Sequence, residues 1–106
     1  MIYRDFIESK IVAEKEDLYY TLGQWRFKLE EIVYVNLTDS VVTAEIVDKL
    51  LDASALGTKL VVSIPKDYIS QAILLASMLF VDKVLLMDES VDKNEIKDYL
   101  QPAVVL

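Results

Sequence analysis

Residues 31–90 decide the fold, because short β-rich runs alternate there with helix-length segments. The runs are IVYVNLT (32–38), KLVVSI (59–64) and KVLLM (83–87), and the segments between them are VVTAEIVDKLLDASAL (41–56) and an apolar stretch at 67–80. Such alternation predicts a parallel sheet covered by helices. Residues 32–37 are apolar on both faces apart from Asn36, as in a central strand. We predict one small α/β domain over residues 1–106, with a mostly parallel or mixed sheet of four to five strands and covering helices.

The helix expected within residues 41–56 is amphipathic. Its apolar stripe consists of Val42, Ile46, Val47, Leu50, Leu51 and Ser54, and most of its charged residues lie outside this stripe. A cap by Thr38, Asp39 or Ser40 is predicted at its start. Gly57 is predicted to end the helix in the left-handed conformation.

The helix expected over 67–80 is apolar around most of its circumference. Pro65 is predicted at its first turn, and its inward stripe is expected to be Ile69, Ala72, Ile73, Ala76 and Phe80. This assignment leaves Leu74, Leu75, Met78 and Leu79 near the opposite side. Such a helix is either deeply buried or covered by a partner, and the sequence leaves both possibilities open.

Residues 1–30 fit two periods. A period of two predicts a hairpin that turns at Gly23-Gln24, whereas the helical period gives one stripe of Leu18, Leu22, Trp25, Leu29 and Ile32 behind Asp17. We favour strands, because aromatic residues and Thr are frequent here and Gly23 would weaken a helix by ~1 kcal/mol. The expectation is a β-rich segment over 1–30, with a further strand around residues 11–13.

The C-terminal part is expected to hold a short helix and an edge strand. Asp92 with Glu95 resembles a capping box, Pro102 would end the helix, and AVVL at 103–106 would add the strand.

Composition excludes several classes of function. The chain has no Cys and no His, and its formal charge is −7. There is therefore no thiolate nucleophile, no imidazole base and no basic surface for nucleic acid. The longest apolar run, at 72–81, is about half the ~20 residues needed to cross a bilayer, and the N-terminus lacks a signal-peptide pattern. We expect a cytoplasmic protein without a cofactor, nucleic-acid binding or membrane insertion.

Two chemical hypotheses concern the ends of the expected strands. Ser40 is a candidate phosphorylation site at a helix start, where phosphate would change the charge of a surface that a partner touches. Asp39, Asp88 and Glu89 follow strands and are candidate magnesium ligands at the carboxyl edge of the sheet. Solvated loop carboxylates are the simpler interpretation of these three residues.

Residues 32–100 resemble the STAS domain of anti-sigma-factor antagonists and sulfate-transporter tails. The resemblance consists of Asp39-Ser40 opening a helix, KLVVSI followed by Pro65 and a helix, and the segment VDKV (81–84) leading to DES (88–90). It implies that Ser40 matches the serine that a partner kinase phosphorylates to abolish binding. The chain departs from the family where Val41 and Val42 replace the small residues and glycine that follow the Asp-Ser pair.

These observations favour a non-enzymatic regulatory or scaffold module that binds another protein. The expected contact residues are Asp39, Ser40, Leu74, Leu75, Met78 and Leu79. A self-assembling structural subunit is the first alternative, and a small acidic ligand-binding or magnesium-binding domain is the second.

Overall fold

The computed structural model describes residues 3–13, 15–37, 41–87 and 104–105. The elements follow one another as α1 (Tyr3–Ser9), β1 (Ile11–Val12), α2 (Lys15–Phe27), β2 (Ile32–Asn36), α3 (Ala44–Ser54), β3 (Lys59–Pro65), α4 (Ile69–Ala76), β4 (Lys83–Met87) and β5 (Val104–Val105). The strands form one sheet in the order β1-β4-β3-β2-β5, and every pair is parallel. The predicted α/β class with a parallel sheet and covering helices is confirmed.

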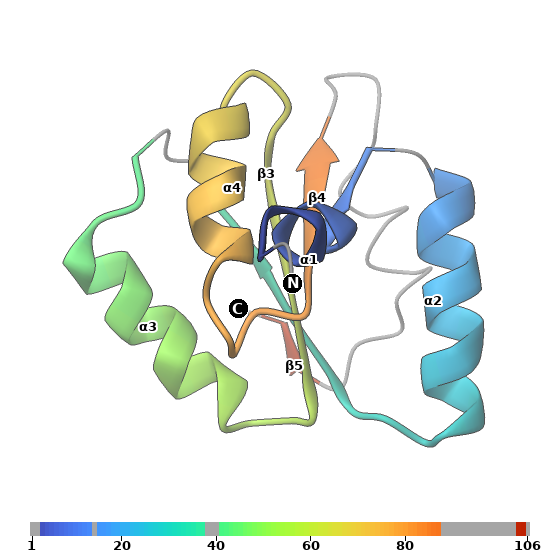
Figure 1. The fold of residues 1–106 in the computed structure, drawn as a ribbon. Helices are drawn as coiled ribbons and strands as arrows, with labels where there is room; N and C mark the ends of the chain where they lie inside the picture. The colour runs from blue at the N-terminus through green and yellow to red at the C-terminus, as the bar shows by residue number, and fades with distance from the viewer. Residues whose placement is uncertain (1–2, 14, 38–40, 88–103, 106) are drawn as a thin grey trace.

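Helices cover both faces of the sheet (Figure 1). One face packs against α3 and α4, with α1 beside α4, and the other packs against α2. Because successive side chains of a strand point to opposite faces, Val33 and Val35 lie in the α3/α4 core while Ile32 and Tyr34 lie in the α2 core. This double coverage explains why β2 is apolar at almost every position.

The N-terminal segment corrects the hairpin prediction. Residues 15–27 form the helix α2, and α1 is also helical, so the segment is not β-rich apart from the short predicted strand β1. Leu18, Leu22 and Trp25 recur at helical spacing and are buried under the sheet. Burying three large side chains contributes several kcal/mol, which exceeds the ~1 kcal/mol helix penalty of Gly23. The helical stripe ends earlier than its pattern suggests, because Leu29 is exposed and Ile32 already belongs to β2.

The boundaries of α3 differ from the prediction at both ends. Thr43 caps the helix by accepting the Ile46 N–H at 3.2 Å, so none of residues 38–40 is its cap. Gly57 does not have a positive φ. Glycine is needed there because the chain passes close to Glu31 and Val33: a Cβ at residue 57 would lie 2.7 Å from the Glu31 carbonyl oxygen and 2.8 Å from Val33 Cγ2. Leu51, placed in the inward stripe, is half exposed.

Pro65 belongs to a strand and not to the first turn of α4. It is the last residue of β3 and pairs with Met87 of β4. The helix begins four residues later at Ile69 and ends at Ala76, so it is shorter than the 67–80 segment. At the C-terminal end, β5 confirms an edge strand within the AVVL segment, while the helix expected over residues 92–100 lies outside the described residues.

Candidate protein-interaction surface

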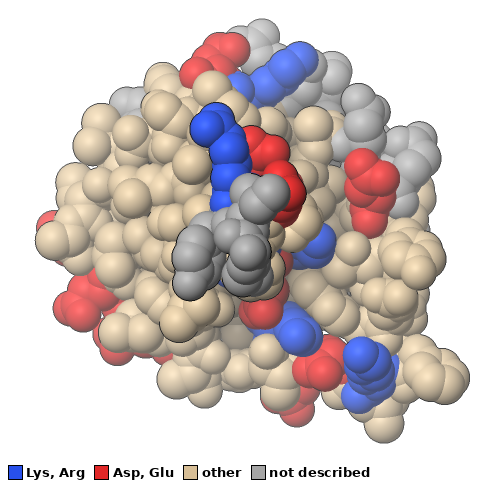
Figure 2. Space-filling model, in the orientation of Figure 1, with Lys and Arg blue, Asp and Glu red and all other residues tan. Residues whose placement is uncertain are grey.

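Helix α4 exposes large apolar side chains without any charge among them. The sequence from Tyr68 to Val81 contains no Asp, Glu, Lys or Arg. Ile69, Ile73 and Leu74 are 48%, 40% and 44% exposed, and Leu79 in the following turn is 88% exposed. We call these four residues the α4 surface. Figure 2 shows the molecule over α4, toward the upper left of the view, as a field of uncharged atoms with charged groups around it.

The side of α4 that faces the core is not the predicted one. Ala72, Leu75 and Ala76 are fully buried, whereas Ile69 and Ile73 are partly exposed. Leu75, predicted as a partner contact, is therefore a core residue. The two small alanines belong to the same buried cluster as apolar residues of the strands. This placement turns the flanking isoleucines outward.

The other predicted contact residues divide into three groups. Leu74 and Leu79 are exposed as expected, whereas Met78 is only partly exposed and packs on the core together with Phe80. Asp39 and Ser40 lie outside the described residues. Asp88 and Glu89, the remaining candidate magnesium ligands, lie outside them as well. In the part of the chain that the structure describes, no three Asp or Glu side chains are grouped so as to hold a metal ion.

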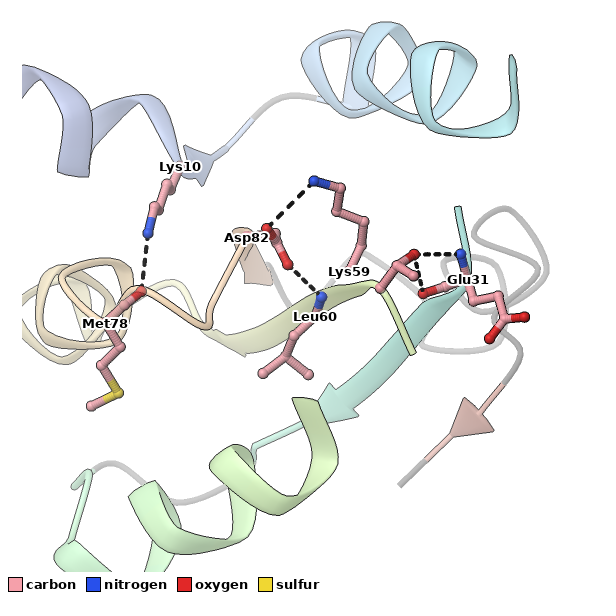
Figure 3. Close-up of polar contacts among 7 residues, drawn as sticks. Lys10, Glu31, Lys59, Leu60, Met78 and Asp82 are labelled. Atoms are coloured by element: carbon pink, nitrogen blue, oxygen red, sulfur yellow. Dashed lines mark hydrogen bonds and ion pairs between the residues drawn. The ribbon is translucent and has the colours of Figure 1, made fainter. Parts of the chain in front are cut away.

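A buried lysine holds the turn that carries Leu79. Lys10 is 7% exposed and donates from Nζ to the Met78 carbonyl oxygen at 3.0 Å (Figure 3). Its ammonium group also lies 4.9 Å from the centre of the Phe6 ring. Burial lowers the pKa of Lys10, an effect that the nearby Asp82 carboxylate partly offsets and Lys83 reinforces. The donated hydrogen bond links the α1–β1 junction to the end of α4.

Asp82 connects the end of this turn to β3. Its Oδ2 accepts the Leu60 N–H at 2.7 Å, and its Oδ1 lies 3.8 Å from Lys59 Nζ (Figure 3). The Asp82 N–H in turn donates to the Leu60 carbonyl oxygen at 2.9 Å. Residues 77–82 are therefore held at both ends, by Lys10 and by β3. Leu79, the one residue of the α4 surface in this turn, therefore lies on a backbone that is supported on both sides.

A chain of hydrogen bonds lies on the opposite face, near the carboxyl ends of β2 and β3. Ser63 Oγ donates to Asn36 Oδ1 at 2.6 Å and is 2.8 Å from the Tyr34 hydroxyl oxygen. Either of the two hydroxyl groups can donate in the second bond. Burial raises the pKa of Tyr34, and the Ser63 hydrogen bond acts in the opposite direction. The chain satisfies polar groups inside the core and is a structural feature.

The sequence pattern missed Ile69 and Ile73 as surface residues. A signal was present, because the segment from Tyr68 to Val81 contains no charged residue and few polar ones to place on the side that faces away from a sheet. The pattern could not identify which side is exposed. As for membranes, none of the helices in the described ranges combines the length and the apolar character that crossing a bilayer requires.

Comparisons with known proteins identify the fold alone. No protein-family model matches the sequence, and no curated protein matches it. Among solved structures, the chain is similar to the lipopolysaccharide core biosynthesis protein from Thermoplasma volcanium GSS1, with a TM-score of 0.59 and 16% sequence identity over 72% of each chain. This likeness supports an α/β domain with a parallel sheet and covering helices.

Proposed function

We propose that this chain is a non-enzymatic, cytoplasmic protein-binding module, regulatory or scaffolding, that holds a partner on the α4 surface. The observation that carries the proposal is the group of four large, exposed, uncharged side chains on a chain whose formal charge is −7. Contiguous exposed apolar residues rimmed by polar ones are typical of interaction sites. Burying such side chains against a partner contributes ~25 cal/mol per Å² of apolar area, before the cost of association.

Phosphorylation of Ser40 belongs to the same proposal. The STAS resemblance supports it, because the matching serine of that family controls partner binding by its phosphorylation state. Thr43 already supplies the cap of α3, so the helix does not depend on the Ser40 hydroxyl for this purpose. The name of the solved neighbour does not enter the proposal, since a likeness at 16% identity supports the fold only.

The test compares two double variants that remove equally exposed leucines. Leu74→Ser with Leu79→Ser alters the α4 surface, whereas Leu51→Ser with Leu29→Ser changes leucines that are 50% and 86% exposed elsewhere. Each protein is immobilised and exposed to extract of its own source, and the retained proteins are identified by mass spectrometry. We expect one partner to be retained by the wild type and the control and to be lost from the α4 variant. Retention of the same proteins by all three would refute the proposal.

Two further experiments test the phosphorylation of Ser40 and the alternative of self-assembly. A Ser40→Asp variant should lose the partner while its thermal unfolding stays nearly unchanged, and equal loss of both would show that Ser40 has only a structural role. Light scattering of the wild type and the α4 variant tests self-assembly. A wild-type oligomer that becomes monomeric in the α4 variant would identify a second copy of the chain as the occupant of the surface.

A further inference from the structure

The side of α2 that faces away from the sheet carries exposed aromatic rings. Leu18, Leu22 and Trp25 pack this helix against the sheet. Half a turn around the helix from them lie Tyr20 and Phe27, which are 72% and 89% exposed. The helix stands at one side of the molecule (Figure 1). It therefore presents a second group of large exposed side chains, distinct from the α4 surface.

A glycine lies between the two rings and leaves a hollow there. The hollow has a volume of about 520 Å³, and Tyr20, Gly23 and Phe27 line it together with their neighbours on the same helix. The Gln24 side-chain amide donates to the Tyr20 hydroxyl at 3.2 Å, which orients this ring beside the hollow. Apart from the backbone of its own helix, no atom of the described residues lies within 4 Å of a Cβ added at Gly23. We call Tyr20, Gly23 and Phe27 the α2 surface.

The packing of a single copy gives no reason for this glycine. A glycine inside a helix weakens it by ~1 kcal/mol relative to alanine, and the space around Gly23 would accept a methyl group. Glycine is useful where another backbone must come close. On the outer side of a helix, that backbone belongs to another molecule.

Two exposed charges flank the α2 surface on one side, and they have opposite signs. Asp17 lies in the first turn of α2, and Lys28 follows its last residue with its N–H still bonded to the Gln24 carbonyl oxygen at 3.1 Å. Because each residue turns a helix by about 100°, two positions eleven residues apart lie within about 20° of each other. Asp17 and Lys28 therefore lie along the same flank, at opposite ends. A second α2 running antiparallel would place its own acidic end beside the basic end of the first.

We propose that two copies of the chain associate through their α2 surfaces, with the two helices antiparallel across a twofold axis beside Gly23. Tyr20 of each copy then lies opposite Phe27 of the other, and the two glycines let the helix backbones come close. Asp17 of each copy pairs with Lys28 of the other at the rim. A twofold contact requires a surface that is complementary to itself, and both the rings and the charges of α2 meet this requirement.

The contact is small, so the dimer is weak. The helix α2 has 13 residues and is therefore about 20 Å long, which gives a contact below the standard size of protein interfaces. The formal charge of −7 on each copy opposes association, and about 0.15 M salt screens this repulsion. We expect a dissociation constant on the order of 100 µM. The α4 surface stays open in this dimer, so the inference goes beyond the proposed function.

Sedimentation equilibrium from about 10 µM to about 1 mM, at about 0.15 M salt, tests the contact. Phe27→Ser should weaken dimerisation about tenfold, whereas Leu79→Ser, at 88% exposure the matched change on the α4 surface, should leave it within about twofold. Gly23→Ala should also weaken it about tenfold, although it raises helix propensity. A wild type that stays monomeric, or equal dissociation constants of the Phe27 and Leu79 variants, would overturn the proposal. The partner test of the α4 surface leaves α2 unchanged, so the two proposals can fail separately.

A charge swap tests the antiparallel orientation. Asp17→Lys and Lys28→Asp should each weaken self-association about tenfold, because each places like charges together at both ends of the contact. An equimolar mixture of the two variants restores both opposite-charge pairs and should associate within about twofold of the wild type. Since Asp17 also interacts electrostatically with Lys83 of its own copy, circular dichroism first checks that each variant is folded. A mixture that associates no better than either variant alone would show that the helices do not pair in this register.

Discussion

Helices α3 and α4 cover the same face of one sheet, but their outer sides differ. The outer side of α3 carries Glu45, Asp48 and Asp52 together with one lysine, whereas α4 carries no charge at all. Their buried sides are similar, because each turns one leucine and at least one alanine toward the sheet, Leu50 with Ala53 and Leu75 with Ala72 and Ala76. Packing on the sheet thus requires the same narrow stripe from both helices.

The outer side of α3 combines charged residues with the half-exposed Leu51, whereas the outer side of α4 has exposed apolar residues and no charge. Exposed Ile69, Ile73 and Leu74 also favour aggregation, which charged residues would reduce. The proposal that a partner covers α4 gives a reason for keeping them.

The largest expected effect distinguishes the buried and the exposed leucine of α4. Leu75→Ala should lower the free energy of unfolding by ~2–5 kcal/mol, because the residue is fully buried and its truncation leaves a cavity. Leu74→Ala, at 44% exposure, should cost less than about 1 kcal/mol. Urea unfolding of both variants measures the difference. Equal losses would mean that the outer side of α4 is covered in solution, and the contrast with α3 would then disappear.

A smaller effect tests the way in which α3 is joined to the sheet. Gly57→Ala should destabilise the protein by ~1–3 kcal/mol, because its Cβ would meet the Glu31 carbonyl oxygen at 2.7 Å. Gly23→Ala is the matched change within α2, where no atom lies within 4 Å of the added Cβ. It should stabilise the protein by ~0.5–1 kcal/mol through helix propensity. Thermal unfolding of both variants gives the signs, and a neutral Gly57→Ala would show that the backbone after α3 relaxes easily.

The smallest expected effect is a pH dependence of stability that arises from Tyr34, on the face of the sheet that α2 covers. Burial raises the pKa of Tyr34 above 10.0, so the unfolded chain loses this proton at a lower pH than the folded protein. The contribution of Tyr34 to stability is complete below pH 10 and is lost as the pH rises through the folded-state pKa. Tyr34→Phe should cost about 1 kcal/mol at neutral pH and should show a shallower decline above pH 10.

The lysines do not obscure this comparison. Burial lowers the pKa values of Lys10 and Lys83, so the unfolded chain binds more protons and stability rises with pH below 10.5. Both lysines are present in the wild type and in Tyr34→Phe, so their contribution cancels in the difference between the two urea-unfolding curves. Parallel curves above pH 10 would contradict the prediction for Tyr34.

Much of the fold follows from local pattern. Mainly apolar runs at 32–37, 59–64 and 83–87 predicted three strands, and the run at 32–37 predicted a central one, because a strand covered on both faces is apolar at most positions. The charged residues of α3 likewise indicated which side of this helix faces solvent. The pattern failed at residues 15–27, where aromatic residues suit strand and helix alike and burial of Leu18, Leu22 and Trp25 decided for helix. It also failed for Gly57, whose role depends on Glu31, far away in the sequence.

The candidate surfaces could be predicted only in part. Composition alone identified a helix with more apolar residues than one buried stripe can hold. Leu74 and Leu79 were correctly predicted to lie on its exposed side. The rotation of the helix about its axis decided which other side chains are exposed: Leu75 faces inward, and Ile69 and Ile73 face outward.

The sequence by itself determined the order of strands and helices from 31 to 87 and the absence of charge on one helix, because periodicity and composition are local properties. Tertiary structure alone decided the helical state of residues 15–27, which leucine of α4 faces water, and why glycine is needed at residue 57. These features depend on contacts between segments far apart in the chain, where the free energy of burial exceeds the small differences in local propensity.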